Sequence, residues 1–198
     1  IAVVLGVAMG FFAAYRRGTW LDTLLMVTAI AGISVPHFWL GLVLLFVFAV
    51  ELAWLPVAGQ GWSSLVLPAL TLGLLGGGWY ARMTRSSMVD VLRQDFITTA
   101  RAKGAGNARI LFVHALRNAA LPLVAMIGLD IGIFMSGAVV VESVFGWPGI
   151  GQLAWQAIQL VDIPVIVGVT TVAACFIVMG NLLADLVAPL VDPRIRLR

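Results

Sequence analysis

Long apolar runs alternate along this chain with short stretches that hold nearly all of its charged residues. The runs cover residues 1–14, 24–50, 65–81, 119–141 and 163–191, the last broken by Asn181 and Asp185. A helix needs roughly 20 mainly apolar residues to span a membrane, and four of the five runs reach or approach that length. The pattern therefore predicts an all-α membrane protein, a polytopic transmembrane helix bundle with five spans in this chain.

Single residues within the runs refine this plan. The run 24–50 is too long for one upright helix, and Pro36 is expected to divide it into an interfacial lead and the span proper. Glycines make the segment 65–80 a poor helix by propensity, so it should either pack tightly against a neighbour or bend. If the protein is a transporter, two of them, Gly76 and Gly77, are candidates to line its translocation path.

The distribution of charge predicts the orientation. All twelve Lys and Arg fall within residues 16–17, 82–117 and 194–198, and none lies in 51–64 or 142–162. With five alternating spans, the basic stretches share one side, which the positive-inside rule makes cytoplasmic. We expect a multi-pass protein of the cell inner (plasma) membrane. The chain begins with Ile inside an apolar run, which suggests one further span upstream, six in all.

Composition excludes other classes of protein. Hydrophobic residues make up 62% of the 198 residues and charged residues 11%, which is not the composition of a soluble domain. The positive charges that give the net charge of +3 all lie in the stretches on one side, so this net charge does not indicate binding of nucleic acid.

Residues 94–118 form a basic, mildly amphipathic stretch between two apolar runs. Asp95 is predicted to cap a first short helix and Asn107 a second, and Gly104 and Gly106 separate them. The apolar sides would carry Phe96, Ile97 and Ala100 in the first helix and Ile110, Leu111 and Phe112 in the second. Such a pair forms either a rigid knob that a soluble partner holds or a charged interfacial loop with no partner.

Two polar residues inside the apolar runs are candidates for the translocation path. A carboxylate such as Asp130 costs on the order of 2.5–3.5 kcal/mol within a membrane, so it should face the bundle interior, a water-filled path or another subunit. Either this carboxylate reflects a cationic substrate, or it is neutralised by protonation. His37, which follows Pro36, either lines the path or packs and hydrogen-bonds beside the kink.

The stretch 142–162 is an apolar, aromatic connection on the side opposite the basic loops. It is expected to form a tight turn and then a short helix over 153–160. It is expected either to dip back into the bundle or meet an exterior protein, or to lie at the interface anchored by Trp147 and Trp155. The candidate contact residues are Glu142, Phe145, Trp147 and Pro148.

No catalytic, metal or cofactor motif is predicted. His37 and His114 lie far apart without an HExxH pair, and the lone Cys175 in an apolar run is expected to be a small buried residue. No glycine-rich stretch ends in the Gly-Lys-Ser/Thr that cradles phosphates. The chain is therefore expected not to be an enzyme, and if it takes part in active transport, a partner must supply the energy.

Several segments resemble one family in the order in which they occur. They are AAYRRGTWLD (13–22), SVPHFWLGL (34–42), LPALTLG (67–73), ARMTRSSMVDVLRQDFITTARAKG (81–104), HALRNAALP (114–122), GAVVVESVFGWPGIG (137–151) and DPRIR (192–196). The chain resembles the permease subunit of an ABC importer of the dipeptide/oligopeptide (peptide/nickel) transport family. The resemblance implies a single permease domain over residues 1–198.

The resemblance also implies partners and a docking site. It implies a second, homologous permease subunit that gives a heterodimer, two ATPase subunits that hold the ATP, an exterior substrate-binding protein and membrane lipid. Peptides are the default substrate, and relatives carry nickel or other small solutes. The ATPase-coupling residues would be Thr98, Thr99, Ala100, Arg101, Ala102, Lys103, Gly104, Ala105 and Gly106.

Several residues depart from the family pattern, and two of these departures affect the candidate sites. Thr98 stands where the broad ABC importer motif has an acidic residue, and Asp130 stands where related permeases carry an uncharged polar one. The alternative is a self-contained secondary transporter or channel, which would usually show internal repeats or several intramembrane charges.

Overall fold

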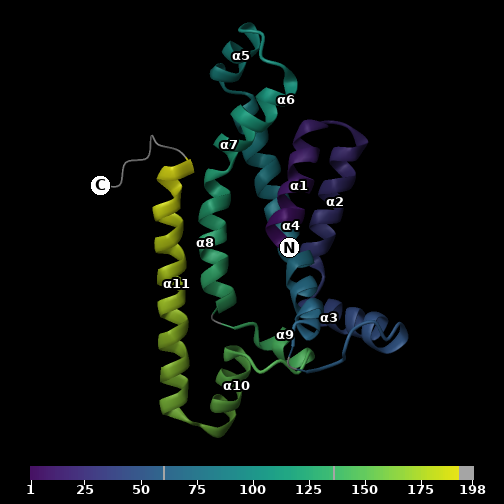
Figure 1. Cartoon of the computed structure of the whole chain (residues 1–198), viewed down its shortest axis with the longest axis vertical. Helices are drawn as coiled ribbons and strands as arrows, with labels where there is room; N and C mark the ends of the chain where they lie inside the picture. The colour runs from purple at the N-terminus through teal and green to yellow at the C-terminus, as the bar shows by residue number, and fades with distance from the viewer. Residues whose placement is uncertain (60, 136, 192–198) are drawn as a thin grey trace.

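A computed structural model of the chain describes residues 1–59, 61–135 and 137–191. The described residues form helices joined by turns, and none of them lies in a strand. The long helices stand in two groups that run side by side (Figure 1). The first group contains α1 (Ala2–Tyr15), α2 (Trp20–Ser34) and α4 (Val66–Leu92), and the second contains α8 (Leu121–Met135) and α11 (Ile163–Val191).

Glycines bring the backbones of the first group into contact. A Cβ at Gly6 of α1 would lie 2.5 Å from the carbonyl oxygen of Gly77 in α4. On another face of α4, a Cβ at Gly78 would lie 2.7 Å from Ile33 Cγ1 of α2. Small residues permit such close approach, and in a membrane packing rather than the hydrophobic effect holds helices together. The glycine-rich segment therefore packs tightly, which was one of the two expectations for it.

The second group is built in the same way. A Cβ at Gly132 of α8 would lie 2.6 Å from Ile177 Cα of α11, and one at Gly128 would lie 2.7 Å from the carbonyl oxygen of Gly180. Gly180 faces back toward α8 and is itself buried. The two groups of helices are thus each locked by contacts between backbones.

Pro36 divides the run 24–50 as predicted, but the order of the two parts is the reverse of the expectation. α2 and the continuous helix formed by α3 (His37–Leu45) and the π-helix η1 (Phe46–Glu51) meet at an angle of 96°. The part before the break packs in the bundle, because Ala29 fits against Gly78 and is buried. The part after the break turns away from α2 (Figure 1).

The predicted run 119–141 is also broken. α8 ends at Met135, and the short helix α9 (Val139–Val144) follows. Gly137 lies between them with a φ of 102°, a backbone conformation that favours glycine. Pro122 lies in the first turn of α8, as expected. The exterior helix α10 (Ile150–Leu160) begins three residues before its predicted start.

By length and apolar composition, the described residues contain fewer helices able to cross a membrane than the five predicted. Two helices, Ser63–Leu92 and Ile163–Leu190, are long and apolar enough to cross a membrane. The first combines the 3₁₀ turn η2 (Ser63–Leu65) with α4. The count rises to four if each of the two bent pairs, residues 20–51 and 107–135, forms one span. α1 is apolar but has 14 residues.

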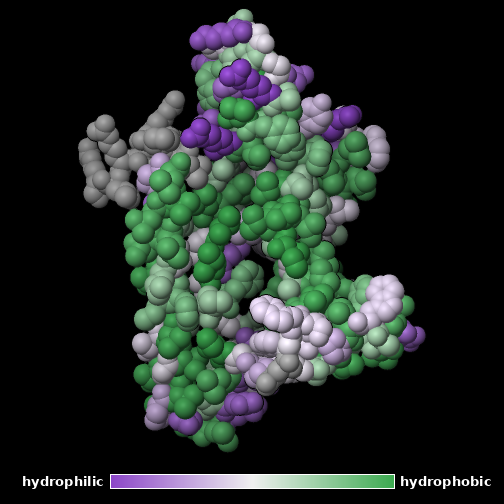
Figure 2. Space-filling view, in the orientation of Figure 1, coloured by the Kyte–Doolittle hydropathy of each residue, from purple (hydrophilic) through white to green (hydrophobic). Residues whose placement is uncertain are grey.

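The two ends of the molecule differ in polarity. α5 (Asp95–Ala102), α6 (Asn107–Arg109) and the turn between α1 and α2 lie at one end, and α9 and α10 lie at the other (Figure 1). Hydrophilic surface gathers over the end that holds α5 and α6, and hydrophobic surface covers the long helices (Figure 2). The predicted basic stretch 194–198 and the DPRIR motif lie outside the described residues.

Candidate coupling surface and membrane cavity

Residues 94–118 form the predicted pair of short helices, with caps displaced by one residue. Gln94 is the N-cap of α5 and Gly106 is the N-cap of α6, each in an extended backbone conformation. Asp95 and Asn107 are therefore the first helical residues rather than the caps. The Asp95 carboxylate still lies in the first turn, where the helix dipole favours negative charge.

A compact glycine turn joins the two helices. The amide of Gly104 donates to the carbonyl of Arg101 at 2.9 Å, and the amide of Ala105 donates to that of Ala100 at 3.1 Å. This is the hydrogen-bond pattern of a Schellman motif, which requires a left-handed residue after the helix. Gly104 supplies it with a φ of 80°.

Apolar contacts fix residues 94–118, the predicted coupling segment, to the first helix group. After α6 the chain continues as the π-helix η3 (Ile110–Ala115) and then α7 (Leu116–Ala119). Side chains of η3 and α7 join a buried cluster with α1 and α4, which contains Phe11, Ala14, Met88, Val89, Val91, Leu111, Ala115 and Ala119. Phe112, exposed on its outer side, stacks on Phe11 with ring centroids 4.8 Å apart.

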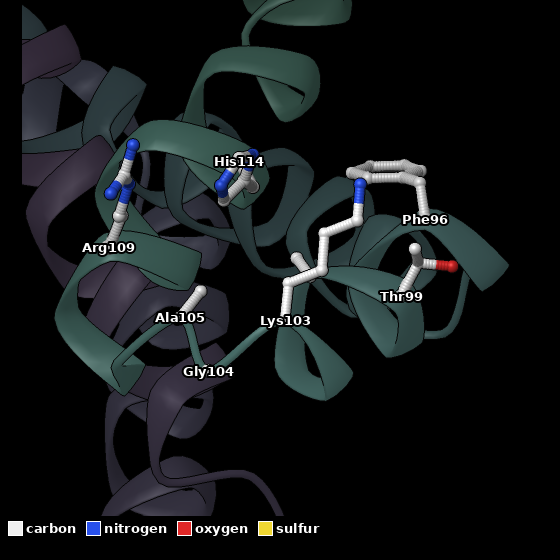
Figure 3. A pocket seen from close by; sticks show the side chains of 8 residues that line it. Phe96, Thr99, Lys103, Gly104, Ala105, Arg109 and His114 are labelled. Carbon is white, nitrogen blue, oxygen red and sulfur yellow. The ribbon is translucent and has the colours of Figure 1, made fainter.

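The exposed side of the segment is concave. A pocket of about 540 Å³ is lined by Phe96, Thr99, Ala100, Lys103, Gly104, Ala105, Arg109 and His114. Figure 3 shows the side chains of Lys103, Arg109 and His114 arranged around the turn at Gly104 and Ala105. Beneath this surface, Ile97 and Ile110 are fully buried, which holds α5 and η3 in place.

Five of the nine predicted coupling residues line this pocket, namely Thr99, Ala100, Lys103, Gly104 and Ala105. The other four, Thr98, Arg101, Ala102 and Gly106, are exposed but do not line it. The structure adds Phe96, Arg109 and His114, which lie inside the predicted segment but were not placed in the coupling set. They were missed because the turn at Gly104 folds η3 back toward α5, and the spacing of these residues in the sequence does not show this fold.

Positive charge dominates the exposed face of this segment. Arg101, Lys103, Arg109 and Arg117 are all exposed, and Asp95 is the acidic residue among them. A surface that is complementary to this one would be acidic. Thr98 contributes no charge to it.

The second candidate site lies between the two helix groups, where α4 and α8 meet. The hydroxyl of Tyr80 donates a 2.6 Å hydrogen bond to Oδ2 of Asp130. Tyr80 is 1% exposed, and Asp130 is half-buried. The Asp130 side chain thus faces the bundle interior, in agreement with the cost of a carboxylate in lipid. Sequence reasoning did not select Tyr80.

Cavities lie on two adjoining faces of α4 and α8, and Asp130 borders both of them. One has a volume of about 280 Å³ and is also lined by Tyr80 and Gly73. The other has a volume of about 340 Å³ and brings Asp130 together with His37 and Gly76. Three of the four candidate path residues therefore meet in one cavity. Gly77 does not line it and packs against α1 instead.

At the opposite end, Glu142 fastens α9 to α10. Its carboxylate oxygens accept hydrogen bonds from the amide of Ala138 at 3.0 Å and the amide of Gln152 at 2.7 Å. Both amides belong to the N-terminal turns of their helices, which attract negative charge. Glu142 thus has a structural role in this region.

The three other candidate exterior contacts differ in exposure. Phe145 is 4% exposed and lies in a buried cluster with Ala49, Leu67 and Val141. It is therefore unavailable to an exterior protein, because α3, α4 and η1 cover its ring. Trp147 is half-buried and Pro148 is exposed, so these two remain candidates for exterior contacts.

An ion pair that the sequence did not reveal connects α2 to α4. Nε and Nη2 of Arg85 donate to the two carboxylate oxygens of Asp22 at 2.5 and 2.7 Å. The amide of Gly18 donates to Oδ2 of Asp22 at 3.0 Å. Asp22 is 4% exposed, so three donors compensate for the burial of its charge.

Cys175 is exposed, which corrects the expectation of a buried thiol. The residue lies on α11, which packs against α8 on one side. The residues of α11 that do not contact α8 form much of the exposed apolar surface of the chain. An apolar run does not distinguish a helix face that is buried in the protein from one that is turned outward.

An apolar helix bundle with a basic helix pair at one end and polar residues in an internal cavity is the architecture of an integral membrane protein. The family model of the "Binding-protein-dependent transport system inner membrane component" matches residues 6–197. The chain belongs to this family, which confirms the resemblance identified from the sequence.

Curated relatives share this sequence over most of its length. The chain is 43% identical over 196 residues to the "Glutathione transport system permease protein GsiC" of Escherichia coli (strain K12). The same identity is found with the proteins of that name from Shigella dysenteriae serotype 1 and Salmonella paratyphi A. Each match covers 98% of this chain and 64% of the relative.

Proposed function

We propose that this chain is a permease subunit of an ATP-driven ABC importer for peptides or similar small solutes. Membership of the binding-protein-dependent transport family supports this proposal. The relatives' names specify glutathione transport, and glutathione is itself a small peptide. Separate ATPase subunits would bind and hydrolyse the ATP, since the sequence carries no phosphate-binding glycine loop.

The coupling segment is the feature that carries the proposal. A lever between two proteins has to be stiff, attached to the moving part and open to the partner. The turn at Gly104 and the buried Ile97 and Ile110 provide stiffness. The cluster around Phe11 attaches the segment to α1 and α4, and the pocket beside Ala105 stays open. Movement then requires different contacts with two states of the ATPase.

The proposed orientation places the coupling segment in the cytoplasm. Arg16 and Arg17 follow α1 at the same end of the molecule as α5 and α6 (Figure 1). The opposite end, with α9 and α10, contains no Lys or Arg over residues 142–162. By the positive-inside rule this end faces outward, where a substrate-binding protein would deliver the solute.

A second permease subunit would complete the translocation path. The outer face of α11 is apolar and largely exposed, which suits contact with lipid or with another permease. We propose a homologous partner that forms a heterodimer with this chain. The cavities beside Asp130 would contribute to the path between the two helix groups.

Site-directed crosslinking between this chain and its ATPase subunit tests the proposal. Ala105→Cys, in a background with Cys175→Ser, places a thiol at the rim of the pocket on the coupling segment. We expect a crosslink to an introduced cysteine on the ATPase, with a yield that changes when ATP is added. The assembled complex is used throughout, because the docking surface requires both partners.

Ala58→Cys is the matched control, since Ala58 is exposed in the connection before α4. It should give no crosslink to the ATPase. If Ala105→Cys and neighbouring positions give none in an intact complex, the coupling assignment is wrong. Transport that continues without any ATPase would favour the alternative, a self-contained secondary transporter or channel.

A further inference from the structure

The cavity of about 340 Å³ between α3, α4 and α8 combines one acidic group with walls that are mainly apolar. Asp130 contributes the carboxylate and His37 an imidazole, while the aromatic rings of Trp79 and Phe134 line the same space. The volume falls in the lower part of the range for small-molecule sites, about 300–1,000 Å³.

Asp130 retains the capacity to bind a donor. The Tyr80 hydroxyl occupies one position on Oδ2. Among the described residues, no Lys or Arg forms an ion pair with this carboxylate. A carboxylate has two oxygens with about four acceptor positions, so most of its acceptor positions can receive a ligand. The hydrogen bond from Tyr80 also holds the carboxylate at the boundary between the two cavities.

The surroundings strengthen attraction to a cation. An apolar cavity has a lower effective dielectric constant than water, so a charge there acts more strongly on a ligand. Phe134 borders the same cavity as Asp130 and can add cation–π attraction, while the Trp79 ring already carries the guanidinium of Arg82 at 5.5 Å from its centroid. The neutral form of His37 offers a further nitrogen acceptor.

From this arrangement we propose that the cavity is a binding site for primary ammonium groups, with Asp130 as the anionic ligand. An amino group of a peptide, at its N-terminus or on a lysine side chain, has this chemistry. The assignment rests on the proposed function, because it places the site in the path of a transported solute. It names the charge that the permease itself recognises, separately from any exterior binding protein.

Cysteine labelling tests this site directly, in the full transporter complex with Cys175→Ser. Met126→Cys places a thiol in the cavity that Asp130 lines. The probes are a cationic reagent, 2-aminoethyl methanethiosulfonate, and an anionic one of similar size, 2-sulfonatoethyl methanethiosulfonate. The measured quantity is the labelling rate with the cationic reagent divided by the labelling rate with the anionic reagent. We expect Asp130→Asn to lower this ratio about tenfold, as removal of a nearby opposite charge predicts.

Two further variants make the result decisive. Asp185→Asn removes an exposed carboxylate on α11 that does not line the cavity, and it should leave the ratio unchanged. Leu72→Cys places a second thiol in the same cavity, in case Met126→Cys does not assemble. An unchanged ratio in Asp130→Asn overturns the proposal, and so does failure of both reagents at both positions. Labelling needs no ATP, so either result leaves the crosslinking test of the proposed function intact.

Discussion

The two helix groups are packed alike but are connected differently to the coupling segment. In both groups, glycines such as Gly6 and Gly132 allow backbones to touch. The group of α1, α2 and α4 is fastened to η3 and α7 through the buried cluster around Phe11. The pair of α8 and α11 is reached through the bend of 47° between residues 107–119 and α8. A force on the coupling segment would therefore act on the first group directly and on the second through this bend.

The boundary between the two helix groups contains cavities, in contrast to the close backbone packing within each group. Cavities border Asp130, and its hydrogen bond with Tyr80 joins α8 to α4. Close-packed interfaces resist continuous deformation, whereas a boundary with cavities can adopt alternative arrangements. We infer that the groups move as units and that the volume beside Asp130 changes when they do.

The largest expected effect follows from forcing the first group apart. Gly6→Val would place side-chain atoms where α4 presents the Gly77 carbonyl and the Tyr80 side chain. Overpacking typically costs about 1–3 kcal/mol, and we expect at least the upper end because backbone atoms have to move. The thermal stability of the purified protein in detergent should fall markedly.

Gly168→Val is the matched control for this change. Gly168 lies in the same kind of apolar helix, but a Cβ there meets nothing within 4 Å. Its stability should stay close to that of the unaltered protein. Equal losses in both variants would mean that valine disturbs these helices generally, and the close contact between α1 and α4 would lose its support.

Local sequence signals predicted much of this architecture. The apolar runs located the helices, the glycines of residues 65–80 suggested either tight packing or a bend, and Gly104 indicated the turn of the coupling segment. Gly104 was informative because a left-handed residue after a helix is a local requirement. Pro36 located a break for the same reason, since a proline restricts its own segment.

Contacts between distant segments were not predictable from one sequence. Asp22 pairs with Arg85 63 positions away, and Tyr80 bonds Asp130 50 positions away. No local pattern encodes either pair. The order of the two parts on either side of Pro36 was predicted wrongly for a related reason. It depends on the fit of Ala29 against Gly78, which is a contact between distant segments. The burial of Phe145 likewise depends on α3 and α4, which lie far from it in sequence.

A smaller effect is expected from loosening α2 within the first group. Asp22→Asn keeps the size of the side chain but removes the charge that two nitrogens of Arg85 contact. Leaving a buried polar partner unsatisfied costs about 1–3 kcal/mol, and more where it is charged. Arg85 remains partly accessible to water, so we expect a loss within that range, measured as a lower midpoint of thermal unfolding.

Asp90→Asn provides the comparison for Asp22→Asn. Asp90 lies on α4, the helix that carries Arg85, but is exposed, so its removal should change stability by less than about 0.5 kcal/mol. A double variant with Arg85→Met would separate the pair from the individual residues. If Asp22→Asn and Arg85→Met are simply additive, the ion pair does not couple α2 to α4.

The smallest effect on stability, but a clear effect on coupling, is expected at the turn. Gly104→Ala introduces no clash, since a Cβ there meets nothing within 4 Å, yet its φ of 80° costs an alanine roughly 1–2 kcal/mol. Gly106→Ala is the control, because Gly106 has a φ of −66° and equally open surroundings. If a stiff turn transmits ATPase movement, Gly104→Ala should lower solute transported per ATP hydrolysed, while Gly106→Ala should not. Equal ratios in both variants would show that the stiffness of this turn is not what links the coupling segment to the two helix groups.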